Sequence, residues 1–262
     1  MSGARFAALA WHGQPVQIEY QWIGKPASPH PAVVFLHEGL GSVSMWRQFP
    51  ANFCAAHGLR GLVFSRVGYG RSTPKHADEH WPPDFMHQQA HDFLPRFLAQ
   101  LGVVKPWLFG HSDGGSIALL HAARFDVAGV VAVAPHLFVE AISIASIEKA
   151  REAYATTDLK QRLARHHEDP DSAFRGWNDA WLSPAFRHWN IEAEVAAITC
   201  PVLAVQGEDD EYGTLEQIRA IARHAPQTKL LVIGQCGHSP HRDVPDVLSR
   251  EAGRFILEPH TA

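Results

Sequence analysis

The chain has 262 residues, of which 46% are hydrophobic and 19% charged, a composition typical of a folded globular protein. Its formal net charge of −4 provides no basic surface for nucleic acid or anionic lipid, so neither is expected as a partner. The longest apolar run, residues 127–134, falls far short of the roughly 20 residues that cross a bilayer, so no membrane span is expected.

The N-terminus and the cysteines indicate a cytoplasmic protein. The apolar stretch at residues 6–11 is followed at once by a His-Gly pair, which makes it too short for a secretory signal. Cys54, Cys200 and Cys236 are odd in number and widely spaced, and no C-x-x-C pair occurs. We therefore expect reduced thiols in a cytoplasmic setting.

Apolar runs typical of strands alternate with amphipathic segments typical of helices along the chain. The strand-like runs are residues 16–23, 32–37, 61–65, 107–111, 127–134, 202–207 and 230–234. The helical patterns are residues 45–57, 86–101, 116–124, 214–224 and 245–257. Continuously apolar strands indicate a sheet covered on both faces, and hence parallel strands with crossover helices. The sequence predicts an α/β fold with a doubly wound, mostly parallel sheet.

One long segment interrupts this alternation. Residues 138–190 contain no clear strand, and they begin with a strongly helical stretch. Since connections in α/β domains are usually short, we interpret this segment as a helical cap inserted into a core of residues 1–137 and 191–262. It is expected to lie over the carboxyl ends of the strands, where such sheets bind ligands.

The 18 histidines raise the question of a metal site. The pairs His76/His80 and His87/His91 have a spacing that could place two rings on one helical face. No H-E-x-x-H motif is present, and the spacing implies no third ligand. We therefore expect solvated histidines, with neither a metal nor another cofactor, and a metalloenzyme is the weaker alternative.

Ser112 stands in a G-x-S-x-G motif between an apolar run and a helical pattern. Gly110 and Gly114 flank it, as required where a sharp strand-to-helix turn crowds the backbone on both sides of a nucleophile. The competing interpretation is an ordinary helix start with a serine cap and packing glycines. The strand before the motif and the helix after it favour a nucleophilic serine.

A nucleophilic serine needs a base to accept its proton and an acid to orient that base. Acidic residues 208–211 follow the strand-like run 202–207, and His238 follows the last run, 230–234. The chain order is therefore serine, acid, histidine. Singly, the acidic run could be a solvated loop and the histidine a polar turn residue. Their combined occurrence at strand ends indicates a catalytic triad.

With these motifs the chain resembles the α/β-hydrolase family over nearly its full length. "LHEGLGS" (36–42) stands at the place of the family's oxyanion loop, and "SRVGYGRS" (65–72) matches a second motif, with Ser65 replacing the usual aspartate. The resemblance implies Asp210 rather than Asp209 as the acid. In "CGHSPHRDVPD" it implies His238 rather than His241 as the base.

The resemblance also implies an oxyanion hole made by two backbone N–H groups, those of Asp113 and Gly39. Glu38 departs from the glycine that is usual at its position. The Asp113 carboxylate could simply favour the helix start and point away from the reaction centre. Alternatively, Asp113 and Glu38 could contact the substrate and give the pocket acidic character.

The residues that line the substrate pocket are the hardest to predict from the sequence. Aromatic residues in the predicted cap are spaced as on the buried face of a helix, and they could pack within the cap or line an apolar pocket. The candidate pocket residues are Glu38, Leu40, Trp46, Trp177 and Trp181.

These observations predict a serine hydrolase that cleaves a small or medium carboxylic ester or lactone through an acyl-enzyme on Ser112. A thioesterase, or a C–C bond hydrolase of ring-fission products, would use the same triad. The latter often have an asparagine and an aromatic where this chain has His111 and Ser239. A non-catalytic ligand receptor on this fold is the alternative from another class. The partner is a small molecule, and the oligomeric state stays open, with a homodimer as one option.

Overall fold

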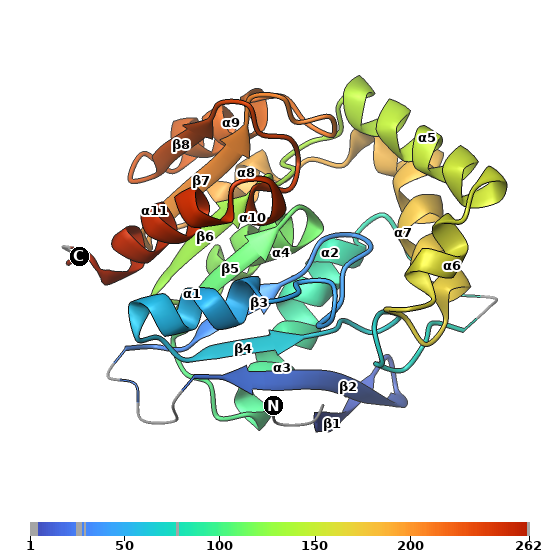
Figure 1. The fold of residues 1–262 in the computed structure, drawn as a ribbon, viewed down its shortest axis with the longest axis horizontal. Coiled ribbons are helices and arrows are strands. Elements are labelled where there is room, and N and C mark those ends of the chain that lie inside the picture. The colour runs from blue at the N-terminus through green and yellow to red at the C-terminus, as the bar shows by residue number, and fades with distance from the viewer. Residues whose placement is uncertain (1–4, 25–27, 29, 77–78, 261–262) are drawn as a thin grey trace.

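The computed structural model describes residues 5–24, 28, 30–76 and 79–260, and within them an eight-stranded sheet (Figure 1). The strands are β1 (Arg5–Trp11), β2 (Gln14–Ile23), β3 (Val33–Leu36), β4 (Gly61–Phe64), β5 (Trp107–His111), β6 (Gly129–Val133), β7 (Val202–Gly207) and β8 (Lys229–Ile233). Their order in the sheet is β1-β2-β4-β3-β5-β6-β7-β8. Strands β3 to β8 run parallel, whereas β1 and β2 are antiparallel. The predicted mostly parallel, doubly wound sheet is confirmed.

Residues 16–23 were predicted as an early strand or hairpin arm, but the strand that pairs with them was not predicted. Residues 6–11, considered above only as a targeting segment, belong to β1, which pairs with β2 from Arg5↔Tyr20 to Trp11↔Gln14. The two residues of the turn, His12 and Gly13, both have positive φ (48° and 77°), which fits the tight hairpin turn that matches strand twist. The His-Gly pair that ended the apolar stretch is thus a turn signal.

Helices connect the strands and cover both faces of the sheet. They are α1 (Phe49–His57), α2 (Phe85–Gln88), the π-helix η1 (Gln89–Phe93), α3 (Leu94–Gln100), α4 (Asp113–Ala122), α5 (Ala141–Thr156), α6 (Leu159–Leu163), α7 (Pro170–Leu182), the 3-10 helix η2 (Pro184–His188), α8 (Glu192–Val195), α9 (Glu216–His224), α10 (Pro240–Asp243) and α11 (Pro245–Leu257). None of the helices in the described part of the chain is long and apolar enough to cross a membrane.

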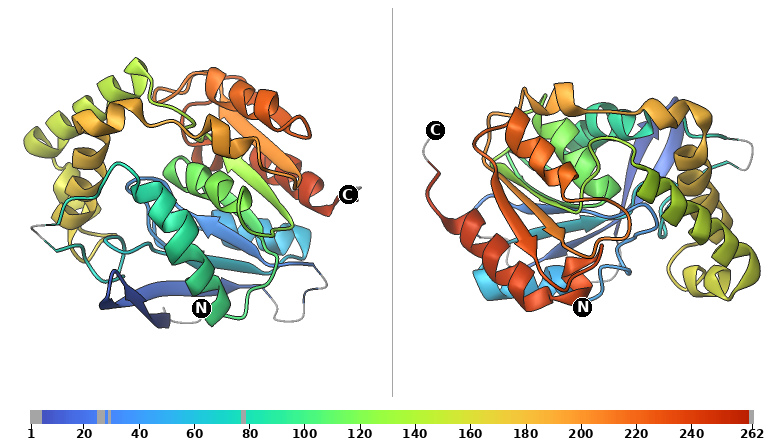
Figure 2. Two further views of the ribbon diagram at one scale, coloured as in Figure 1. Left: turned by 180° about the vertical axis from the view of Figure 1, so that it is seen from behind. Right: turned by 90° about the horizontal axis from the view of Figure 1, so that it is seen from above.

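Two apolar clusters, one on each face, hold these layers together. In β3, Val34 and Leu36 contribute to the cluster on the side of α3 and α4, whereas Val33 and Phe35 contribute to the cluster on the side of α1 and α11. The alternation follows from the two-residue period of a strand. Figure 1 shows α1 and α11 on the near face, and the reverse view in Figure 2 shows α3 and α4 on the other.

The last strand departs from the predicted pattern. Residues 230–234 were expected to form a strand covered on both faces, but Leu230 and Val232 in β8 are 44% and 41% exposed. Strand β8 lies at the edge of the sheet and pairs only with β7, so its outer positions extend past the covering helices. An apolar run therefore did not imply burial here.

The helices α5 to α7 and η2 form a cap that is inserted between β6 and β7 and lies to one side of the sheet (Figures 1 and 2). An isolated bridge pairs Phe138 with Asn190, and the Ile191 N–H donates to the Leu137 carbonyl (2.7 Å). These contacts join the chain segment that enters the cap to the segment that leaves it. The cap thus stands on a closed base next to the end of β6.

Candidate active site

Ser112 sits in a strained turn between β5 and α4. Its backbone has φ 54° and ψ −122°, a conformation that L side chains rarely adopt, so the fold rather than the residue imposes it. A side chain at Gly110 would collide with the carbonyl of Gly114, and one at Gly114 would collide with the carbonyl of Leu36. The two glycines predicted to permit the turn are therefore sterically required. Helix α4 starts at Asp113, three residues earlier than predicted.

The structure brings Ser112, His238 and Asp210 together. The His238 Nε2 lies 2.9 Å from the Ser112 Oγ, and its Nδ1 lies 2.8 Å from the Asp210 Oδ1. All three residues are buried, with at most 9% exposure. This is the geometry in which an imidazole can take a proton from a hydroxyl while a carboxylate orients it.

Asp210 is held more firmly than its neighbour Asp209. Its Oδ1 also accepts from the N–H groups of Tyr212 (2.8 Å) and Gly213 (3.3 Å), and its Oδ2 accepts from the Gln206 amide (3.1 Å). Burial favours the neutral acid, but the hydrogen bond and charge of His238 outweigh it and lower the pKa of Asp210 below its ordinary value. Asp209 is exposed. The carboxylate beside the histidine is thus Asp210.

The sequence between the first parallel strand and the last helix matches one known family. A family model described as "Alpha/beta hydrolase family" covers residues 33–251. The chain belongs to the alpha/beta hydrolase family.

Solved structures of similar fold include hydrolases with two different named activities. The enol-lactonase from Burkholderia xenovorans LB400 matches 96% of this chain and 100% of its own, with 20% identity and a TM-score of 0.73. A thermophilic esterase from Thermogutta terrifontis matches 97% and 100%, with 19% identity and a TM-score of 0.71. At such identities the likeness concerns the fold.

A curated relative shares more of its sequence, over a shorter region. It is 2-succinyl-6-hydroxy-2,4-cyclohexadiene-1-carboxylate synthase of Photorhabdus laumondii, which is 33% identical over 100 residues. This match spans 38% of the chain and only 32% of the length of that relative.

In this hydrolase the loop after β3 presents the N–H of Gly39 in a fixed direction. The Glu38 carbonyl accepts from the His37 Nδ1 (2.7 Å) and from the Arg66 Nη2 (2.9 Å). Because a trans peptide is planar, its N–H points away from its carbonyl, so these two bonds also orient the Gly39 N–H. Gly39, Asp113 and Ser112 line one cavity. The arrangement supports Gly39 as the second oxyanion donor, beside the N–H of Asp113 at the start of α4.

The departure at Ser65 is compensated by a carboxylate from another strand. Ser65 Oγ donates to the Glu19 Oε2 (2.8 Å), and the Arg71 N–H donates to the same atom (3.0 Å). The Ser65 Oγ also accepts from the Val43 N–H (3.0 Å), which ties it to the end of the oxyanion loop. Glu19 of β2 thus supplies the acid that the usual aspartate would have contributed.

A cavity of about 280 Å³ opens beside Ser112. Helices of the cap supply its apolar wall, together with the loop after β3, and these lining residues are Leu40, Met45, Ile147, Leu159, Leu163, Trp177 and Trp181. The polar lining includes Glu38, Asp113, His136, Glu211, Tyr212 and Arg242. Four of the five predicted pocket residues, Glu38, Leu40, Trp177 and Trp181, are therefore placed at the cavity.

The prediction that Trp46 lines the pocket was wrong. Its side chain is 2% exposed and packs edge-on against Phe35 (5.8 Å between ring centroids) and at a tilt against His241 (5.0 Å). These contacts belong to the apolar cluster between the sheet and α1 and α11. Nearness in sequence to the oxyanion loop did not translate into nearness to the cavity.

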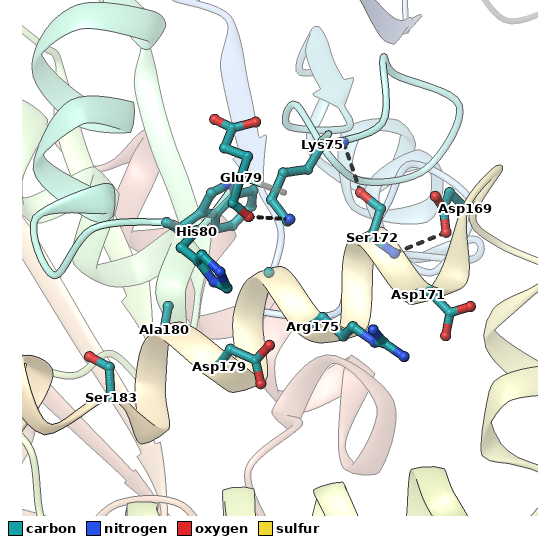
Figure 3. A pocket seen from close by; sticks show the side chains of 12 residues that line it. Lys75, Glu79, His80, Asp169, Asp171, Ser172, Arg175, Asp179, Ala180 and Ser183 are labelled. Atoms are coloured by element: carbon teal, nitrogen blue, oxygen red, sulfur yellow. Dashed lines mark hydrogen bonds between the residues drawn. The ribbon is translucent and has the colours of Figure 1, made fainter. Parts of the chain in front are cut away.

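A second cavity, of about 320 Å³, lies where α7 meets the loop after β4 (Figure 3). There the Lys75 N–H donates to the Ser172 Oγ (2.8 Å), and the Ser172 N–H donates to the Asp169 carboxylate (2.9 Å). None of the triad residues lines this cavity. The Lys75–Ser172 bond attaches the cap to the core, and the smaller cavity is the one that Ser112 and His238 line.

The Asp113 carboxyl neither lies free at a helix start nor faces solvent. It is fully buried, and its Oδ1 accepts from the indole N–H of Trp181 in α7 (3.1 Å). Burial raises its pKa to about 6, although the charge of Arg66 and the Trp181 hydrogen bond act in the opposite direction. The carboxylate therefore links the nucleophile helix to the cap.

Replacing Asp113 with asparagine is expected to change how stability depends on pH. The carboxyl titrates at about 6 when folded and near 3.9 in an unfolded chain, so the folded state binds this proton more tightly. The stability it contributes is complete below about pH 4 and is lost as the pH rises through about 6. The difference corresponds to roughly 3 kcal/mol at neutral pH.

Thermal unfolding of both proteins across this pH range checks the prediction. Asparagine stays neutral and keeps an acceptor for Trp181, so the Tm of Asp113→Asn relative to the natural protein should rise from about pH 4 to about pH 7. A Tm difference that is constant over this range would contradict it.

The His87 and His91 rings lie edge to face, 5.8 Å apart between centroids, but each turns to a different partner. His87 Nε2 lies 3.3 Å from the Glu194 carboxylate, and His91 Nε2 lies 3.3 Å from the Leu120 carbonyl. Residues 77 and 78, between His76 and His80, lie outside the described residues. Among the residues that are described, no group of three or more His, Cys, Asp or Glu side chains could hold a metal ion.

Several polar residues at the site, among them His136, Arg242 and His111, were not predicted from the sequence as pocket or support residues. His136 and Arg242 line the cavity, and His111 contacts the backbone of His238. His136 follows the end of β6, so its position at a strand end was a usable signal. Nothing local marked the other two.

Proposed function

We propose that the protein is a serine hydrolase of small or medium, uncharged carboxylic esters or lactones. The Ser112 Oγ attacks the carbonyl carbon while the His238 Nε2 takes its proton, and Asp210 stabilises the resulting imidazolium. The N–H groups of Gly39 and Asp113 hold the oxyanion. His238 then returns the proton to the departing alkoxide, and water, deprotonated by the same imidazole, cleaves the acyl-enzyme.

The observation that carries this proposal is the pair of short contacts of His238, 2.9 Å to Ser112 and 2.8 Å to Asp210, at the floor of a cavity. The strained φ of Ser112 adds support because strain of this kind persists where a site requires it. The family and the named lactonase and esterase of similar fold are consistent with acyl transfer.

The size and walls of the cavity favour a compact apolar substrate. A volume of about 280 Å³ lies at the low end of small-molecule sites. Isoleucine, leucine and tryptophan side chains of α5, α6 and α7 form one wall, which suits an alkyl or aromatic group of an ester or lactone.

The charges around the cavity disfavour substrates that carry a carboxylate. Glu38, Asp113 and Glu211 line it, and Arg242 is the one arginine or lysine among the described lining residues. The Arg242 guanidinium is already paired with Glu38 (3.1 Å). The curated relative is named for a carboxylate compound. In this cavity, however, the carboxylate of a substrate would find no unpaired arginine or lysine among the described lining residues.

A fluorophosphonate probe and a matched pair of esters test the proposal. The probe should label the protein at Ser112. The kcat/KM for p-nitrophenyl butyrate should be at least ~10-fold higher than that for mono-p-nitrophenyl succinate, which is equally long, because the free carboxylate of the succinate ester would be buried without a partner. Absence of labelling would refute the serine mechanism. Equal rates on both esters would refute the preference for uncharged substrates.

A further inference from the structure

The imidazole of His111, the residue before Ser112, contacts the loop between β8 and α10 that carries His238 (the base loop, residues 234–239). It is 1% exposed, and its Nε2 lies 2.7 Å from the backbone carbonyl of His238. A carbonyl oxygen can only accept, so the His111 Nε2 donates this hydrogen bond. The strained turn between β5 and α4 that carries Ser112 (the nucleophile elbow) therefore holds the backbone of His238, the residue proposed as the base.

The other nitrogen of the same ring faces the oxyanion loop. The His111 Nδ1 lies 3.6 Å from the Glu38 Oε2, too far for a hydrogen bond, whereas the Glu38 Oε1 accepts from the Arg242 Nη2 (3.1 Å) of α10. Although burial favours the neutral acid, the nearby His111 ring and the Arg242 guanidinium hold the pKa of Glu38 well below its ordinary value. The Glu38 side chain is only 16% exposed, so this carboxylate is shielded from solvent.

We propose that two contacts, of Glu38 with Arg242 and of His111 with the His238 carbonyl, form a positioning bridge that holds the oxyanion loop, the nucleophile elbow and the base loop in one fixed arrangement. This inference rests on the proposed hydrolase function, but it assigns residues that the triad and the oxyanion hole do not use. Glu38 belongs to the oxyanion loop and His111 to the nucleophile elbow. His238 lies in the base loop, and Arg242 lies in α10, which follows it.

The bridge acts on the distance over which the proton moves. The His238 backbone is fixed on one side by the bond from its N–H to the Glu211 Oε2 (3.1 Å) and on the other by His111. Without the second bond its carbonyl is left buried and unpaired, and the loop can shift to relieve this. Misplacing a reacting group by about 1 Å costs roughly 10²-fold in rate, whereas substrate binding in the cavity is little affected.

Two variants of similar size at position 111 test the bridge. In His111→Gln the amide nitrogen stands near the place of Nε2 and still donates to the His238 carbonyl, whereas His111→Met fills the same space without a donor. We expect His111→Met to lower kcat roughly 10–100-fold with little change in KM, and His111→Gln to retain most of the activity. Rates are expressed per active site, as counted with a fluorophosphonate probe, so that unfolded protein does not contribute.

The outcomes separate the possibilities. A methionine variant with the natural kcat, or a glutamine variant as slow as the methionine one, would overturn the bridge, and so would a loss of Tm without a loss of kcat. If the natural protein itself does not react with the probe, the hydrolase proposal fails instead.

Should His111→Met not fold, a pair at position 38 gives the same test. Glu38→Gln keeps an oxygen for Arg242, and Glu38→Met removes it. We expect a lower kcat for methionine than for glutamine, at similar KM. Equal kcat values in this pair would overturn the role of Glu38.

Discussion

Replacing Ser112 with alanine is expected to lower kcat for ester hydrolysis by about 10⁶-fold. The proposed acyl-enzyme forms on its Oγ, and within the described residues no other hydroxyl hydrogen-bonds to the His238 Nε2. A residual rate above that of water is expected because the oxyanion donors and the cavity remain.

Hydrolysis of p-nitrophenyl butyrate, together with fluorophosphonate labelling, measures this effect. Circular dichroism and Tm show whether the variant folds, and they should be close to those of the natural protein because alanine removes one oxygen atom from a strained position. Hydrolysis by Ser112→Ala at the natural rate would refute both the nucleophile and the acyl-enzyme.

Asp210→Asn is expected to cause a smaller loss, about 10⁴-fold in kcat. The amide has the size of the carboxylate, but it does not stabilise the imidazolium, and it can hold the ring in the wrong tautomer. KM should change little because the Asp210 side chain is not among the groups that line the cavity.

Asp209→Asn is the matched control for this measurement. Asp209 is the exposed neighbour, and its side chain has no part in the triad, so its replacement should leave kcat within about twofold, as is typical of surface changes. If Asp209→Asn were the slower of the two variants, the acid would have to be reassigned.

The fold and the elbow could be predicted because their signals are local. Apolar runs mark the buried strands, and Gly110 and Gly114 mark a turn whose geometry excludes side chains. The acidic run 208–211 and His238 were predicted from their positions after strands, since parallel strands end at the same edge of a sheet, and the family resemblance then selected Asp210. The structure brings them together within hydrogen-bond distance of each other and of Ser112.

The supporting contacts could not be predicted because they join distant parts of the chain. Trp181 reaches Asp113 across 68 residues, and His111 reaches His238 across 127. No pattern in the sequence around either partner specifies the other. Trp46 illustrates the same limit from the opposite side, since its neighbours in the core, rather than its neighbours in sequence, determine where its indole lies.

The closed base of the cap has a consequence for how such a protein can diversify. Because Phe138 and Asn190 are paired, the chain leaves the core and returns to it at adjacent points. Helices between these two points can be lengthened, lost or exchanged by recombination while the register of β6 and β7 is retained. Gly110 and Gly114 have no such freedom, because backbone atoms occupy the space that a side chain would need. A change of cap would therefore alter the cavity wall that α5, α6 and α7 supply, while the turn at Ser112 stays as it is.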